Sequence, residues 1–240
     1  MNKNLAFFFL ISSSLCFGQI SPGNAKIYSW FDNEVGIENT RLYNGIEYIE
    51  KHRTINEKNK FFFSNSTVIG EILYDGEWFT DLPLKYNVFE DLLLIQLESG
   101  SGKSILQPVK DKVERFHLNN HIFLNILPRS AGNSGTGFHE VLWESSDLAI
   151  LKKHSKKLIE KRDRKVEYFE FNYLKPNYVL RFNDQFFNLN SKRDMVRIFP
   201  ENEELIDKFY KKNSTLVRRQ PDIFFVNLIK ELSSLNGEMN

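Results

Sequence analysis

The chain has 240 residues, with 32 lysines and arginines against 31 acidic side chains and a single cysteine. Its formal net charge of +1 gives no electrostatic basis for a nucleic-acid partner, so we exclude that class of function. The length fits one domain, and a chain of this size buries roughly 70% of its unfolded surface, enough for a core without crosslinks.

The first eighteen residues, MNKNLAFFFLISSSLCFG, have a lysine near the start, a short apolar run and small residues near Gly18. This order is typical of a secretory signal peptide, and the apolar run is too short to span a bilayer. We therefore expect residues 1–18 to be cleaved and residues 19–240 to form a single exported domain. A buried N-terminal element is the alternative. Cleavage removes Lys3 and no acid, which brings the net charge from +1 to zero.

The single cysteine limits the chemistry of the exported chain. Cys16 lies within the expected signal peptide, so the mature chain would hold no disulfide, catalytic thiol or cysteine-ligated metal. A lipoprotein would instead keep Cys16 as its acylated first residue. Leu15 stands where lipid-modification signals carry a small residue, which argues against lipidation.

Residues 22–60 mix aromatic side chains with Asn, Glu and Lys and show no clear period. Residues 47–57 fit either a helix or an irregular arm laid on a sheet. The run Phe61-Phe62-Phe63 follows, and we expect it to be buried.

Residues 66–97 predict two β-hairpins end to end and open a first β half that extends over residues 66–127. Asp75-Gly76 lies between strand-like runs and is a strong signal for a tight turn in which both residues have positive φ. Large apolar side chains fall on both faces of this hairpin, so we expect the sheet to be covered or curled here. The turn sets three cross-strand pairs: Tyr74 with Glu77, Leu73 with Trp78, and Ile72 with Phe79.

Gly102-Lys103-Ser104 resembles the end of a phosphate-binding P-loop. The full motif needs a glycine five positions before Gly102, where this chain has Leu97, and a helix after the lysine. Residues 105–108 indicate a short strand instead. We therefore interpret the segment as a hairpin loop and not as a nucleotide site.

Two histidine patterns resemble metal sites. His117 and His121 have the i, i+4 spacing that would suit a metal on a helix, but residues 112–127 predict a hairpin around Asn119-Asn120 that turns the two rings to opposite faces. His139-Glu140 begins like a zinc-protease helix, yet the motif needs a histidine where this chain has tryptophan. We therefore expect no metal site in either place.

A Gly/Ser/Asn-rich loop, residues 128–136, separates the first β half from a second at residues 137–189. Within the second half, residues 152–165 hold eight basic side chains and two acidic ones. They predict a long hairpin with its tip at residues 162–164. The stretch either contacts an anionic partner, such as lipid headgroups or acidic glycan, or forms an exposed edge that lysines protect from pairing. The candidate anionic-partner contacts are Lys152, Lys153, Lys156, Lys157, Lys161, Arg162, Arg164 and Lys165.

The remaining chain is aromatic and then helical. Aromatic residues between 168 and 178 belong to the core or to a platform that stacks on glycans. Ser191 and Asp194 predict a capping box, and helices extend over residues 191–236 with an apolar stripe in the last one. The expected fold is mainly β (α+β): an antiparallel meander forming a curled sheet, half-barrel or sandwich, with two or three C-terminal helices packed on it.

Four blocks carry a resemblance over most of the exported chain: Tyr43-Asn44-Gly45 with Glu47-Tyr48, residues 70–93 (GEILYDGEWFTDLPLKYNVFEDLL), residues 112–125 and residues 137–143 (GFHEVLW). They resemble a group of uncharacterised secreted or periplasmic proteins of the Bacteroidetes. The resemblance implies a Gram-negative envelope setting and supplies no site residues. The helical C-terminus does not resemble the Ig-like secretion domain of that phylum, which favours the periplasm or the outer membrane over the medium.

Three function classes follow. The first is a non-enzymatic envelope protein that binds another envelope protein, a lipid or a glycan. The second is a carrier that encloses an apolar ligand in a curled sheet. The third is a hydrolase, which would require clustered histidines and carboxylates in a cleft; the five histidines are scattered in the sequence. We expect no cofactor, no catalytic residue and no transmembrane span in the mature chain.

Overall fold

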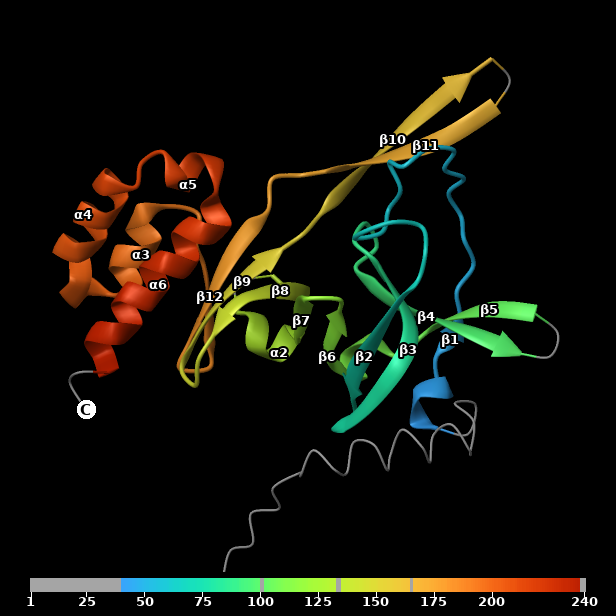
Figure 1. Cartoon of the computed structure of the whole chain (residues 1–240), viewed down its shortest axis with the longest axis horizontal. Coiled ribbons are helices and arrows are strands. Elements are labelled where there is room, and N and C mark those ends of the chain that lie inside the picture. Colours follow the sequence, from blue (N-terminus) through green and yellow to red (C-terminus); the bar gives the residue numbers. More distant parts are fainter. Residues whose placement is uncertain (1–39, 100–101, 133–134, 165, 238–240) are drawn as a thin grey trace, which may run out of the picture.

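The computed structural model describes residues 40–99, 102–132, 135–164 and 166–237. The predicted signal peptide and Cys16 lie outside these ranges. The described chain is mainly antiparallel β, with an eleven-stranded curled sheet, a separate two-stranded hairpin and a group of C-terminal helices beside one end of the sheet (Figure 1). This confirms the expected fold class.

The strands are β1 (Ile46–Glu47), β2 (Val68–Tyr74), β3 (Glu77–Asn87), β4 (Leu92–Ser99), β5 (Gly102–Gln107), β6 (Val113–Leu118), β7 (His121–Ile126), β8 (Gly137–Glu144), β9 (Leu148–Lys153), β10 (Lys156–Asp163), β11 (Val166–Tyr173), β12 (Asn177–Phe182) and β13 (Gln185–Asn188). The α-helices are α2 (Pro128–Ala131), α3 (Lys192–Ile198), α4 (Glu203–Lys212), α5 (Leu216–Arg219) and α6 (Pro221–Gly237). The short 3-10 helices are η2 (Arg41–Tyr43), η3 (Lys110–Lys112) and η4 (Pro200–Asn202).

The main sheet has the order β1-β5-β4-β3-β2-β6-β7-β8-β9-β12-β13. The chain runs outward from β2 to β5 and then returns to place β6 beside β2, so the predicted meander reverses direction once. A second interruption follows β9, where the chain leaves the sheet to form β10 and β11 before it returns as β12. Among the described strands β1 and β13 are the two edges, and they do not pair with each other, so the sheet stays open.

The tight turns form where the sequence predicted them. Asp75 and Gly76 have φ values of 54° and 82°, and the three predicted pairs across this turn are all present. Asn119 has a φ of 51° at the β6–β7 turn, which sets Phe116 opposite Phe123. These residues accept positive φ at low cost, so the local sequence determines the register.

Several details of the prediction are wrong. The hairpin turns after Asp163 and not at residues 162–164, since Asp163 still pairs with Val166. Phe61 is buried as expected, but Phe63 is 43% exposed. Successive side chains of an extended chain alternate in direction, so three adjacent phenylalanines cannot all face one core.

Apolar packing divides into two large clusters. One fills the first half of the sheet around Ile72, Tyr86 and Phe116. The other joins β9 and β12 to the helices, where Leu180, Met195 and Phe224 are buried together. The predicted apolar stripe of α6 therefore faces the sheet.

The C-terminal helices begin and end as simple helix rules require. Ser191 and Asp194 form the predicted capping box at the start of α3. The helix α4 has acidic residues in its first turn and lysines in its last, as the helix dipole favours. The single turn α5 was not predicted. No helix in the described ranges combines the length and apolar character needed to cross a membrane.

Candidate functional site

The hairpin β10–β11 is the element that stands apart from the rest of the fold. Eight cross-strand pairs join its strands, from Lys156 with Tyr173 at the base to Asp163 with Val166 near the tip. It belongs to neither half of the main sheet and projects away from the body of the molecule (Figure 1). A two-stranded hairpin is at best marginally stable in water, so its base needs support.

Lys156 supplies part of that support. Its ammonium group donates to the backbone carbonyls of Asn59, at 2.7 Å, and Phe61, at 2.6 Å, and lies 4.3 Å from the centre of the Tyr173 ring. The Tyr173 hydroxyl donates to the carbonyl of Phe62 at 2.7 Å. Burial lowers the pKa of Lys156 to about 8. The base of the hairpin is thus joined to residues 59–62.

An arm, defined as residues 48–61, runs along the hairpin. The sequence allowed either a helix or an irregular arm over residues 47–57, and the structure has the irregular arm. The amides of Phe169 and Phe171 donate to the carbonyls of Arg53 and Lys58, both close to 2.9 Å, so the arm extends the hairpin by short strand-like contacts. The side chains of Asn56 and Lys58 both donate to Glu170, at 2.9 Å. The arm therefore covers the proximal half of β11.

His52 fixes the middle of the arm by aromatic packing. Its ring makes edge contacts with Phe89, Phe169 and Phe171, with centroids 5.2–5.9 Å apart. Phe89 comes from the β3–β4 turn, and the two other rings come from β11. The arm, the hairpin and the main sheet thus meet at one histidine.

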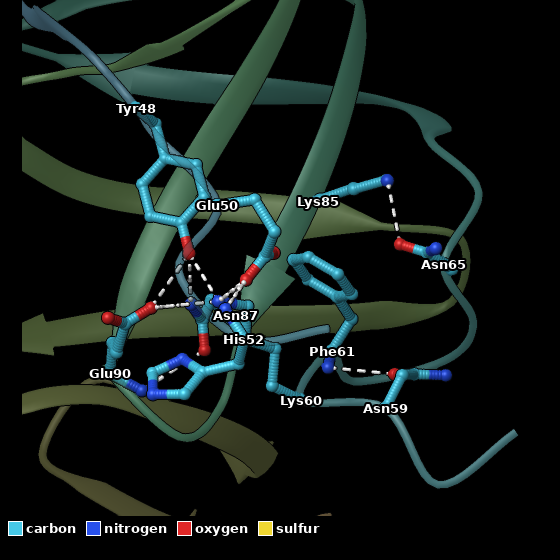
Figure 2. A network of polar contacts seen from close by, with 10 residues as sticks. All are labelled: Tyr48, Glu50, His52, Asn59, Lys60, Phe61, Asn65, Lys85, Asn87 and Glu90. Atoms are coloured by element: carbon cyan, nitrogen blue, oxygen red, sulfur yellow. Dashed lines mark hydrogen bonds and ion pairs between the residues drawn. The ribbon is translucent and has the colours of Figure 1, made fainter. Parts of the chain in front are cut away.

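A buried lysine holds the arm to the main sheet. Lys60 is 1% exposed, and its ammonium group contacts the Tyr48 hydroxyl at 2.5 Å, a Glu50 oxygen at 2.6 Å and a Glu90 oxygen at 3.3 Å. Figure 2 shows these groups converging on one point, together with the fully buried Asn87, whose amide donates to Glu90. Tyr48, Glu50 and Lys60 belong to the arm, whereas Asn87 ends β3 and Glu90 lies in the β3–β4 turn.

The network places one cation, Lys60, against the two carboxylates of Glu50 and Glu90. Burial opposes the ionisation of Glu90, but the bond from the Tyr48 hydroxyl, the Lys60 charge and the Asn87 amide together lower its pKa below the usual value. Burial and the adjacent carboxylates raise the pKa of Tyr48 well above that of a free phenol. Since a lysine has three N–H donors and Lys60 has three acceptors, the arrangement suits an anchor better than a proton-transfer group.

The eight basic residues predicted to contact an anionic partner divide into two groups. Lys152 is bound to Asp222 at 2.7 Å, Lys153 to Asp91 at 2.8 Å, and Lys156 to the backbone described above. These three stabilise the fold. The exposed ones are Lys157, Lys161, Arg162 and Arg164; Lys165 lies outside the described residues.

The outer face of the distal hairpin combines charged and apolar groups. Cross-strand partners share a face, so Lys161 lies beside Tyr168, and Asp163 lies beside Val166, which is 41% exposed, on that same face. Arg162 pairs with Glu167 on the other face. Arg164 occupies the tip with a φ of 53°. The outer face is opposite to the one that carries Phe169 and Phe171 toward His52.

A second cluster, which the sequence did not predict, gathers histidines on one carboxylate. Glu140 accepts from His121 at 2.5 Å and from His154 at 2.6 Å, and Phe62 packs against both rings. Burial opposes ionisation of Glu140, but these two bonds lower its pKa. The side chains come from β7, β8 and the β9–β10 junction, and the residues are 14 to 33 positions apart, so no local motif reveals them.

The other histidines lie apart from that cluster's carboxylate. His117 pairs with Glu71 at 2.5 Å. His139 is 1% exposed and donates from Nδ1 to the carbonyl of Gly137 at 2.9 Å. His117 and His121 point to opposite faces as predicted, with Leu118 opposite His121. Within the described chain no group of three or more His, Cys, Asp or Glu side chains has a geometry suited to a metal ion.

The two false motifs have the predicted backbone. Lys103 lies on β5, so a strand and not a helix follows the glycine of the P-loop-like sequence. His139 and Glu140 lie on β8, where their side chains point to opposite faces and cannot form the zinc-protease arrangement.

Comparison with other proteins adds no relative. The chain matches no family model, no curated protein and no solved structure in these comparisons. The resemblance to a Bacteroidetes envelope group therefore stays a prediction.

Proposed function

We propose that this protein is a non-enzymatic protein of the cell envelope that binds anionic lipid headgroups through the distal half of the β10–β11 hairpin. The supporting observation is the hairpin itself, which is anchored at its base and presents four exposed cations beyond the anchor. The envelope setting rests on the signal-peptide pattern of residues 1–18 and on the Bacteroidetes resemblance.

The mixture of groups favours a lipid surface over a dissolved polyanion. Lysine stems lie along apolar surface while their charges reach outward, and tyrosine suits a boundary that is apolar on one side and wet on the other. Lys161, Val166 and Tyr168 share one face of the hairpin. The charge is moderate, because residues 157–167 hold five basic and three acidic side chains.

The two other function classes have less support. Side chains such as Ile72, Leu84 and Phe116 fill the first half of the sheet, and the hollows described below lie elsewhere, so nothing favours a carrier with an apolar interior. The Glu140 cluster is the nearest arrangement to a catalytic one. Its carboxylate is already bound by two histidines, and it lines none of four well-formed hollows on the described chain.

Vesicle co-sedimentation tests the proposal. The chain of residues 19–240 is mixed with phosphatidylglycerol–phosphatidylcholine vesicles and, separately, with phosphatidylcholine alone. A cation near an anionic membrane contributes about 1 kcal/mol, so K161Q/R162Q/R164Q should weaken binding to the anionic vesicles by roughly a hundredfold. The matched control, R193Q/K211Q/R219Q, removes the same charge from exposed positions on the helices and should bind like the unmodified chain.

Three results would contradict the proposal: equal binding to both vesicle types, equal losses in the two triple variants, or no binding to either vesicle. Hairpin-dependent retention on immobilised polygalacturonate without vesicle binding would identify an acidic glycan as the partner and refute the lipid assignment.

A further inference from the structure

A hollow of about 530 Å³ lies between the end of the sheet and the C-terminal helices, far along the chain from the arm. Pockets of this size accommodate small organic molecules. Its lining comes from the β11–β12 connection, the start of β12, the β13–α3 connection, the start of α3, α4, α5 and the start of α6. The hollow therefore forms only when the helices pack on the sheet.

Three aromatic side chains provide an apolar wall. Tyr178 and Phe225 pack with ring centres 4.6 Å apart, and Tyr210 lines the hollow from the end of α4. The Tyr178 hydroxyl donates to Asp222, so its polar end is already occupied. Burial raises the pKa of Tyr210 to about 12, which keeps this phenol neutral at physiological pH. Such a wall suits a flat ring.

The charged lining has one sign. Lys175, Lys192 and Arg218 line the hollow, and no lining residue on the described chain is acidic. The Lys175 ammonium makes no hydrogen bond or ion pair with the described residues. Arg218 uses Nε for the carbonyl of Ser214, which leaves its two terminal nitrogens available. Lys192 is compensated by Asp207 at 2.6 Å. Two cations thus remain without a carboxylate.

The neighbouring hollow provides a useful contrast. It has about 570 Å³ between α4 and α6, but its lining includes Glu204 and Glu231 as well as Lys208 and Lys212. Acidic and basic groups there offset each other. Volume alone does not distinguish the two hollows; the aromatic wall and the uncompensated cations do.

We propose that the hollow bounded by Lys175, Tyr178, Tyr210, Arg218 and Phe225 binds a small organic anion that has one acidic group attached to a flat apolar ring. The ring lies against the aromatic wall, and the acidic group accepts from Arg218 and Lys175. This site is separate from the hairpin and does not depend on lipid binding.

A pair of related dyes tests the site. 1-Anilinonaphthalene-8-sulfonate has a sulfonate and a flat ring system, and N-phenyl-1-naphthylamine has the same rings without the charge. Fluorescence titration of the full exported chain should show saturable binding of the sulfonate and binding at least about tenfold weaker for the neutral dye, since a hydrogen bond to a charged group contributes about 1.5–3 kcal/mol.

The variant K175Q/R218Q should weaken sulfonate binding by about tenfold or more. The control K211Q/R219Q removes the same charge from neighbouring exposed positions outside the lining and should change binding less than about twofold. All four of these side chains are exposed, so both variants should fold, and near-UV circular dichroism with thermal unfolding verifies this.

Equal dye affinities, equal losses in both double variants, or sulfonate binding that appears only when near-UV circular dichroism is lost would each overturn the proposal.

Discussion

Lowering the pH should destabilise this protein through His139, which is buried on β8. Burial first, and then the ammonium group of Lys153, lowers the pKa of His139 from about 6.5 to about 4. Asp91 also faces the ring and raises the pKa of His139, which partly offsets the effect of Lys153. His154 lowers that pKa further. The folded chain therefore holds the ring neutral at a pH where the unfolded chain protonates it.

The sign and size of the effect follow from proton linkage. The unfolded chain takes up the proton near pH 6.5, whereas the folded chain takes it up only near pH 4. The contribution to stability is complete above pH 6.5 and is lost as the pH falls toward 4. A pH of 5 lies about 1.5 units below the pKa of the ring in the unfolded chain. At about 1.4 kcal/mol for each unit, the free energy of unfolding falls by about 2 kcal/mol.

Urea unfolding at pH 7.5 and pH 5, followed by tryptophan fluorescence, measures this loss. The variant H139N removes the titrating ring. Between the two pH values its free energy of unfolding should fall by about 2 kcal/mol less than that of the unmodified chain. V141A, on the same strand and face, should destabilise the fold yet keep the full pH dependence. The remaining histidines and carboxylates titrate in all three proteins and cancel in the comparison. An H139N variant with the same pH dependence as the unmodified chain would refute the reasoning.

Two substitutions test the backbone and the arm. G137A should cost at least about 2 kcal/mol in urea unfolding, because φ is +88° and the new Cβ would lie 1.8 Å from a carboxylate oxygen of Asp91. G76A, in the β2–β3 turn at φ +82° with no atom within 4 Å, should cost only about 1 kcal/mol. K60M should cost about 3 kcal/mol, because it leaves carboxylates without their buried cation, and should expose the arm to limited proteolysis. K58M, which removes a side chain that is 55% exposed, should cost less than 1 kcal/mol, and comparable losses in the two lysine variants would contradict the proposed anchor.

The sequence predicts what local chemistry determines. Asp75-Gly76 and Asn119 specify tight turns, and the turns set the register of their strands without help from the rest of the chain. The capping box at Ser191 and the apolar stripe of α6 are local in the same sense. The tip of β10–β11 was misplaced because the turn uses Arg164 at positive φ, a residue type that rarely accepts that conformation, while Asp163 offered a more typical turn signal.

What the sequence does not predict depends on distant residues. The pairing of β2 with β6 follows an outward excursion of two hairpins, and no turn specifies it. The Lys60 anchor joins residues 10 to 30 positions away, and its partners are ordinary polar residues in the sequence. The division of the basic stretch into buried and exposed cations has the same origin, since Asp91 and Asp222, which neutralise two of the lysines, come from other elements.

The docking of the arm on β11 has a consequence for the time course of folding in the cell. Lys58 and Glu170 are 112 positions apart, and a ribosome adds roughly 5–20 residues per second. The arm therefore waits about 6–22 s after its own synthesis before its hairpin partner exists. During that interval the carbonyls of Arg53 and Lys58 have no strand to accept from, and His52 lacks two of its three aromatic neighbours. A chain kept unfolded until export is complete avoids this interval, because both partners then become available together.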